Sequence, residues 1–191
     1  MPSTVSPTPS ADQTITVADP PTGIAIPMRI PPPLAAIRRR WDEAALAGAR
    51  SHVTVLYPFV PVAHLVAADR ATLAGIARAV EPFDVRFERV RRIDDGVVWV
   101  EPEPAEPFRR LTAAVHARWP DYPPYEGRFD EVIPHLTIVE SDVVSLAPVE
   151  VAALASVPFI ARASRMELWR QDDAGRWHPH WLMRLGRRNA D

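Results

Sequence analysis

The chain has 191 residues, of which 47% are hydrophobic, and such a chain can bury a core in one domain or in two small lobes. It contains no cysteine, which excludes disulfide bonds, thiolate zinc sites and cysteine nucleophiles. The formal net charge is −2, and the chain has arginines but no lysine. This balance argues against a dedicated duplex-DNA binder, whereas a few arginines suit a small phosphate-bearing ligand.

Residues 1–21 are rich in Pro, Ser and Thr and contain no aromatic residue, so we predict a disordered tail. They lack the basic start and the apolar run of a secretory signal. No window approaches the roughly 18 apolar residues that a membrane span needs. We therefore expect no membrane association, a cytoplasmic protein, one ordered domain over residues 22–186, and a short tail over residues 187–191.

The first half of the ordered chain predicts two strands and two helices. In chain order they are a strand at Gly23–Met28, a helix at Leu34–Ala47, a strand from His52 to Phe59 and a helix at Ala67–Val80. The first helix carries three consecutive arginines, residues 38–40. We place them mostly on its solvent-exposed face and keep a phosphate-binding patch as the alternative.

The second half predicts a similar series. A half-buried strand at Pro82–Glu88 alternates apolar and polar residues, and a turn at residues 94–96 leads into a strand at Val97–Val100. A helix at Pro107–Trp119, a loop, a strand containing His135 and a helix at Pro148–Ala155 follow. Two strands, Phe159–Arg170 and Arg176–Leu185, then close the domain around residues 172–175.

One short motif occurs twice, once in each half. Ser51–Val55 and Pro134–Ile138 both contain His, apolar, Thr, apolar in that order. Because successive side chains of a strand point to opposite faces, His52 and Thr54 share one face, and His135 and Thr137 share one face of the second strand. A strand with an apolar face for the core and a His-Thr pair on the other face is suited to lining a groove.

The sequence around the motif repeats as well. Each half runs strand, helix, His-Thr strand, helix and hairpin, and a Pro-Phe pair places its Phe 31 residues after the first His and 24 after the second. A repeat of this length predicts two similar lobes related by a pseudo-two-fold axis. Such an axis brings the two His-Thr strands face to face across a central groove.

Two facing histidines suit acid-base chemistry at phosphorus. One imidazole takes a proton from an attacking water or hydroxyl while the other gives a proton to the leaving oxygen. The threonine hydroxyls, with nearby arginines, hold the non-bridging oxygens. These parts fit in-line displacement at a phosphodiester without a metal or other cofactor. A 2′,3′-cyclic phosphate is the natural substrate, and the reverse reaction would join it to a 5′-hydroxyl.

The two His-x-Thr-x motifs resemble those of the 2H phosphoesterase superfamily, which includes the bacterial 2′-5′ RNA ligase and cyclic phosphodiesterase family. The resemblance covers residues 22–186. It implies an α+β, bilobal fold of two antiparallel sheets flanked by helices, with catalytic roles for His52 and His135 and phosphate binding by Thr54 and Thr137. We expect a monomer whose partner is a nucleotide or a short RNA end.

Four further residues are candidates for groove contacts. Tyr57 and Tyr125 could stack a base, with core packing as the alternative, and strict alternation puts Tyr57 on the opposite face from Thr54. Arg86 and Arg162 alternate away from their apolar neighbours, which favours the groove or an exposed surface.

Two other classes of function stay open. The same groove could bind a nucleotide or RNA end without turnover. Alternatively, His178 and His180 could ligate zinc together with one of the motif histidines, in a metal-dependent hydrolase, although no carboxylate at a suitable spacing completes that set.

Overall fold

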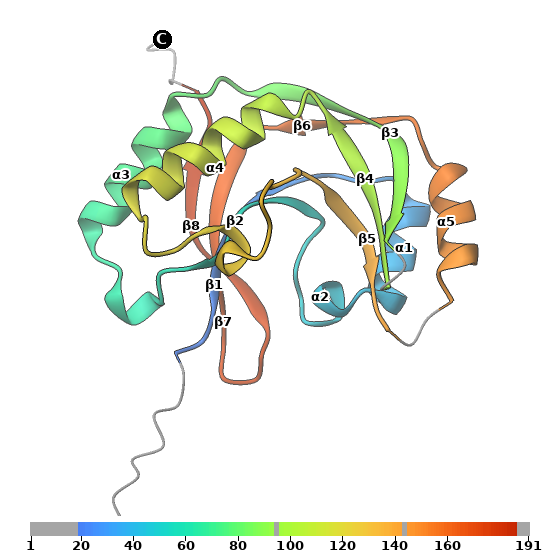
Figure 1. Cartoon of the computed structure of the whole chain (residues 1–191), viewed down its shortest axis with the longest axis horizontal. Coiled ribbons are helices and arrows are strands. Elements are labelled where there is room, and N and C mark those ends of the chain that lie inside the picture. Colours follow the sequence, from blue (N-terminus) through green and yellow to red (C-terminus); the bar gives the residue numbers. More distant parts are fainter. Residues whose placement is uncertain (1–18, 94–95, 143–144, 187–191) are drawn as a thin grey trace, which may run out of the picture.

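The computed structural model describes residues 19–93, 96–142 and 145–186, which form two lobes side by side (Figure 1). Each lobe is built on a four-stranded antiparallel sheet, with strand orders β2-β1-β7-β8 and β5-β4-β3-β6. The predicted α+β, bilobal fold is therefore confirmed. Residues 1–18 and 187–191, and the first two residues of the predicted turn at 94–96, lie outside the described residues.

The elements follow the predicted order. The first sheet contains β1 (Thr22–Pro27), β2 (His52–Phe59), β7 (Arg165–Gln171) and β8 (Trp177–Arg184). The second contains β3 (Phe83–Ile93), β4 (Val97–Glu103), β5 (Leu136–Glu140) and β6 (Phe159–Ala163). The helices are α1 (Pro32–Trp41), α2 (Glu43–Leu46), α3 (Ala67–Arg78), α4 (Glu106–Arg118) and α5 (Leu146–Leu154), with short 3-10 turns η1 (Val62–His64) and η2 (Pro124–Gly127).

The two halves of the chain exchange a helix. The α1 helix follows β1 of the first sheet, yet it packs against β5 and α5 of the second lobe. Conversely, α4 follows β4 of the second sheet and packs against β2 and α3 of the first lobe (Figure 1). Each sheet is thus covered by one helix of its own half and one of the other half, as a pseudo-two-fold arrangement requires.

The two motif strands occupy equivalent places. Both β2 and β5 are edge strands of their sheets, and they contact each other between the lobes. The residues between His and Thr, Val53 and Leu136, are fully buried in the common core, whereas His52 and His135 are only partly buried. Each strand therefore gives its apolar face to the core and leaves its His-Thr face for the site.

The predicted helix at Leu34–Ala47 is wrong as one continuous helix. It breaks at Asp42, which is extended at φ −87° and ψ 120°. The Asp42 carboxylate accepts a hydrogen bond from the backbone N–H of Ala45 at 2.9 Å and so caps α2. Aspartate competes in this way for backbone donors at the starts of helices, and here it starts a second helix.

The predicted strand at Phe159–Arg170 is also wrong as one strand. The β6 part pairs with β3 of the second sheet, and the β7 part pairs with β1 of the first. The chain crosses between the sheets at Ser164, the single residue between the two strands. The residue pattern could not reveal the crossing because β6 and β7 follow one another without a turn sequence.

A bulge in β2 changes the face of Tyr57. Thr54 pairs with Ala25 while Leu56 pairs with Ile24, so β2 contains one extra residue there. The carbonyl of Val55 at this bulge accepts a hydrogen bond from the Thr112 hydroxyl of α4 at 2.7 Å. The extra residue returns Tyr57 to the face of Thr54, and the expectation from strict alternation is wrong.

Candidate active site

The two motif histidines are held in the same way. His52 Nδ1 lies 2.7 Å from the carbonyl oxygen of Arg50, and His135 Nδ1 lies 2.8 Å from that of Ile133. A carbonyl oxygen can only accept, so Nδ1 carries a hydrogen in both rings. This leaves Nε2 of each imidazole as the atom that gains or loses a proton.

Each imidazole also lies against a tryptophan. The ring of His52 meets that of Trp169 edge-on, with centroids 4.8 Å apart. His135 lies 5.4 Å from Trp99 at a tilt of 59°. The tryptophans come from β7 and β4, beyond the motif strands themselves, and together with the Nδ1 hydrogen bonds they fix the orientation of both rings.

Tyr125 joins the first motif from a strained turn. Its backbone has φ 51° and ψ 35°, in the left-handed region that residues other than glycine seldom adopt. Burial raises the pKa of the Tyr125 phenol, a hydrogen bond with the Thr54 side chain opposes the rise, and the Glu140 carboxylate adds to it. The structure thus brings Tyr125 beside Thr54, and strained backbone of this kind is typical of functional sites.

Arg38 contacts the second motif and was missed from the sequence. It is only 3% exposed, so its placement on a solvated helix face is wrong. Its guanidinium donates a hydrogen bond to the carbonyl of Thr137 and lies 2.8 Å from the Asp42 carboxylate. Asp42 in turn accepts a hydrogen bond from the backbone N–H of Glu140 at 3.1 Å. This pair therefore satisfies backbone groups along the open edge of β5.

A signal for the buried arginine was present in the sequence. Leu34, Arg38 and Asp42 follow one another at four-residue intervals, which places them on one side of a helix. The apolar Leu34 marks that side as buried, and an aspartate four residues after an arginine supplies the partner that a buried charge needs. By contrast, Arg39 and Arg40 are exposed, as predicted.

The surroundings of His52 favour its neutral form. Burial lowers the pKa of His52 to about 4. The hydrogen bond with the Arg50 carbonyl opposes this shift, and the positive charges of Arg38 and of protonated His135 add to it. At neutral pH, His52 Nε2 therefore presents a lone pair, as a general base must.

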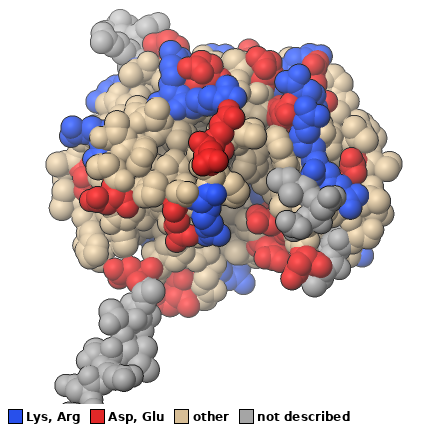
Figure 2. Space-filling model, viewed as in Figure 1, with Lys and Arg blue, Asp and Glu red and all other residues tan. Residues whose placement is uncertain are grey.

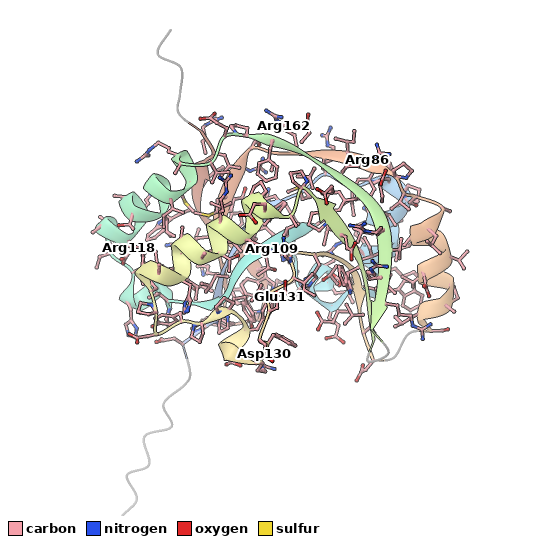
Figure 3. All side chains as sticks on the ribbon, turned by 45° about the horizontal axis from the view of Figure 1, so that its top comes forward. Arg86, Arg109, Arg118, Asp130, Glu131 and Arg162 are labelled. Carbon is pink, nitrogen blue, oxygen red and sulfur yellow. The ribbon has the colours of Figure 1, made fainter. Side chains whose placement is uncertain are left out.

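The structure does not bring Arg86 and Arg162 to the motifs. Arg86 is on β3 and Arg162 on β6, the two strands of the second sheet farthest from β5. Both lie near the top of Figure 3, and they pair with Glu88 and Asp84. Arg86 is opposite Glu103 on β4, four residues along that strand from the Trp99 that pairs with Thr137. Two strand spacings and this offset separate it from the phosphate-binding position expected at Thr137.

Tyr57 lies on the face of the motif but at a distance from the histidines. Its ring lies 6.0 Å from that of Trp177, and a Cβ added to Gly23 would meet it at 3.2 Å. Gly23 therefore leaves the space that the Tyr57 ring occupies. At 37% exposure the ring is accessible to a ligand that extends along the first sheet.

Two pockets flank the motifs, and the space-filling view shows the molecule hollowed where the lobes meet (Figure 2). A pocket of about 400 Å³ lies on the first sheet and includes Arg50, two residues before His52. A second pocket, of about 280 Å³, includes Ile133 and Pro134, next to His135. Each motif histidine thus follows, within two residues, a residue that lines a pocket, and the two pockets could receive the two sides of a substrate.

The histidine pair His178 and His180 forms no metal site in the part of the chain that the structure describes. There, no group of three or more His, Cys, Asp or Glu side chains is placed to hold a metal ion. His178 instead lies 2.8 Å from the Asp172 carboxylate within its own hairpin. Among the same residues, no helix has the length and apolar character to cross a membrane.

The fold and the paired motifs define a class of protein. Two antiparallel sheets that bring two His-x-Thr strands together are the arrangement expected of a 2H phosphoesterase, and the match to a family model agrees with this class. Within that class it belongs to the 2′-5′ RNA ligase superfamily, whose sequence model matches residues 26–175. Membership indicates a phosphoesterase or RNA ligase-like enzyme. No curated protein sequence matches the chain.

Solved structures share the fold at low identity. E. coli LigT, crystallised with 3′-AMP, is 15% identical with a TM-score of 0.52, and the match covers 88% of this chain and 99% of LigT. TT0787 of Thermus thermophilus is 18% identical with a TM-score of 0.57, covering 86% and 97% of the two chains. A structure described as a phosphoesterase is 15% identical with a TM-score of 0.51, covering 88% and 99%. These likenesses support the architecture.

Proposed function

We propose that this enzyme opens 2′,3′-cyclic phosphates on nucleotides or RNA ends with water, and that it joins such an end to a 5′-hydroxyl through a 2′-5′ linkage when that hydroxyl attacks in place of water. The observation that carries the proposal is the matched pair of imidazoles. Both Nδ1 atoms are engaged by backbone carbonyls, which leaves both Nε2 atoms for proton transfer between the lobes. The crystal complex of E. coli LigT with 3′-AMP supports the ligand class, because 3′-AMP is a product of opening such a ring.

The roles follow from the environment of each histidine. His52, whose pKa is lowered to about 4, acts as the general base and takes a proton from the attacking water. The new P–O bond forms as the bond from phosphorus to O2′ or O3′ breaks, and His135 gives its proton to the departing oxygen. Ring opening therefore consumes one water and leaves His52 with an extra proton and His135 without one. Release of the first proton to solvent and uptake of one by His135 restore the starting state.

The threonines stabilise the charge on phosphorus. Thr54 and Thr137 lie on the faces of their strands that also carry His52 and His135, and their hydroxyls can donate to non-bridging oxygens. Arg38 contributes from behind Thr137, because its buried charge remains close to the site without direct exposure to solvent. No step requires a metal ion.

The test is turnover of a 2′,3′-cyclic nucleotide in the presence of EDTA. We expect His52→Ala and His135→Ala each to lower kcat by about 10³-fold, as is usual for loss of a general acid or base. His178→Ala is the matched control, since that histidine is exposed and lies 2.8 Å from the Asp172 carboxylate of its own hairpin, and it should keep wild-type activity.

Two outcomes contradict the proposal. Activity that EDTA abolishes and zinc restores would identify a metal-dependent hydrolase. Nucleotide binding without turnover in the wild type, unchanged in the double histidine variant, would identify a binding module that uses the same groove.

A further inference from the structure

We propose that the pocket beside His52 binds a second phosphate of the substrate, one nucleotide away from the phosphodiester that reacts. The inference rests on the proposed function and narrows its substrate class to nucleic-acid ends that carry at least two phosphates. Three arginines and one serine line this pocket: Arg50, Arg165, Arg184 and Ser164.

The pocket lies on the same side of the first sheet as the reacting groups. Thr54 of β2 pairs with Ala25 of β1, and Ala25 pairs with Glu167 of β7, so the three residues form one row. Two strand spacings, about 10 Å, separate the ends of this row. Glu167 lines the pocket, which places its arginines within reach of the nucleotide next to a phosphate held at Thr54.

Arg50 connects the pocket directly to His52. Its backbone carbonyl accepts the Nδ1 hydrogen of His52, and its guanidinium lies over the ring of Trp169, 5.8 Å from the centroid. The same tryptophan packs against the His52 ring. A phosphate that binds Arg50 therefore lies beside the catalytic base.

The arginines of the pocket keep donors for a ligand. The buried Glu167 carboxylate pairs with Arg50 and Arg165 and accepts a hydrogen bond from Trp169 Nε1 at 2.7 Å. The side chains of Arg50 and Arg165 are still 49% and 36% exposed, and a guanidinium has five N–H donors. Glu167 thus orients the guanidinium groups of Arg50 and Arg165, and their remaining N–H groups are available to a ligand in the pocket.

Arg184 adds a charge that no carboxylate offsets. It lies opposite Arg165 on β8, is exposed, and forms no ion pair with any residue that the structure describes. Three arginines against one glutamate leave the pocket with two positive charges in excess. Planar guanidinium groups bind phosphate through paired hydrogen bonds, so a phosphate is the ligand that this set fits.

The pocket beside His135 has the opposite balance. Arg89 and Arg109 line it together with three glutamates, residues 101, 103 and 106, which leaves one negative charge in excess. A second phosphate is therefore accepted on the His52 side and disfavoured on the His135 side. This one-sided charge gives the otherwise pseudo-symmetric site a direction along the substrate.

Two parts of a substrate could supply this phosphate. It is either the 5′-phosphate of the nucleotide that carries the cyclic phosphate or the 3′-phosphate of the nucleotide that carries the 5′-hydroxyl. Beside the arginines, Pro179 and the 52% exposed Leu182 form an apolar wall suited to a sugar or base in either case.

The first experiment measures binding, so it does not depend on turnover. Calorimetric titration compares a nucleoside 3′-phosphate with the matching 3′,5′-bisphosphate. In the wild type we expect the added phosphate to lower Kd about tenfold, the usual worth of a charge-assisted contact. In Arg184→Gln and in Arg165→Gln that advantage should fall to about twofold, with the Kd of the monophosphate changed much less.

Matched variants make the result specific. Arg118 lies at the far end of α4 from Arg109 (Figure 3) and is, like Arg184, exposed. Arg118→Gln removes the same charge and should keep the tenfold advantage, and so should Arg109→Gln in the other pocket. The proposal is overturned if the wild type shows no advantage, or if the advantage persists in Arg184→Gln and Arg165→Gln.

Turnover then assigns the source of the phosphate. A lower KM for a 2′,3′-cyclic nucleotide with a 5′-phosphate than without one indicates the strand that carries the cyclic end. A lower KM for a 2′-5′ dinucleotide with a 3′-terminal phosphate than without one indicates the other strand. If no substrate is turned over while the bisphosphate advantage stands, the proposed function fails and the phosphate pocket is retained.

Discussion

The two lobes use different side chains to pair a backbone carbonyl of their motif strands. Both motif strands are sheet edges with unpaired backbone groups, and in both lobes the exchanged helix reaches across to one carbonyl of the strand. Thr112 of α4 donates to Val55, and Arg38 of α1 donates to Thr137. Each donor lies six positions after the first residue of its helix, so the donors are equivalent in the repeat, while the acceptors differ by one position along the motif.

The difference between these donors is one positive charge. Thr112 supports its strand without charge, whereas Arg38 brings a buried guanidinium and the Asp42 carboxylate that balances it. The Arg38 charge is one of the causes that lower the pKa of His52. The repeat thus sets the shared geometry, and a departure from the repeat supports the different roles that we propose for the two histidines.

Removal of the charged donor should have the largest effect on stability. In Arg38→Gln the Asp42 carboxylate stays buried without its cation, and we expect the free energy of unfolding to fall by about 3 kcal/mol. Urea denaturation measures this loss. Adding Asp42→Asn to the variant should recover part of it, because no unpaired charge then remains. A double variant less stable than Arg38→Gln would contradict this account of the pair.

Substitution of the motif threonines tests whether both lobes contribute a hydroxyl that stabilises the phosphate. Valine keeps the branched shape of threonine and removes the hydroxyl, so Thr54→Val and Thr137→Val should each lower kcat by about 10²-fold with little change in stability. Steady-state kinetics on a 2′,3′-cyclic nucleotide measure both variants. Wild-type kcat in either one would show that its lobe does not contact the phosphate.

The neutral donor should matter least. Thr112→Val leaves the Val55 carbonyl without its partner, and we expect a loss of about 1 kcal/mol in the free energy of unfolding. The Thr112 contact supports the bulge behind Tyr57 and carries no charge. The variant should therefore leave the pH dependence of activity unchanged. Urea denaturation and a pH profile check the two statements separately. A shifted profile would mean that the bulge, and not only Arg38, influences His52.

The sequence predicted the symmetric part of the molecule well. The order of the elements and the doubled motif follow from local periodicity and from the repeat, and both survive in the structure. The bulge at Val55 and the crossing at Ser164 depend on pairing between strands distant in sequence, so alternation within one strand could not reveal them. They account for the wrong face of Tyr57 and for the single strand predicted at Phe159–Arg170.

The asymmetric part of the site was harder to predict. Arg38 is one of three consecutive arginines, and the packing of α1 against the other lobe buries it while its neighbours stay exposed. The phosphate pocket combines residues from three distant segments: Arg50, Arg165 and Arg184. The pocket arginines share no local pattern, and the spacing of Leu34, Arg38 and Asp42 occurs only once, whereas the His-Thr motifs could be recognised because the chain repeats them.

The most direct test of these roles is the pH dependence of kcat/KM for a 2′,3′-cyclic nucleotide, which reports ionisations of the free enzyme. His52 must be neutral to act as base, and burial and Arg38 lower its pKa to about 4, so activity should be lost only as the pH falls through that region. An acid limb near pH 6.5, the ordinary value for histidine, would contradict the account.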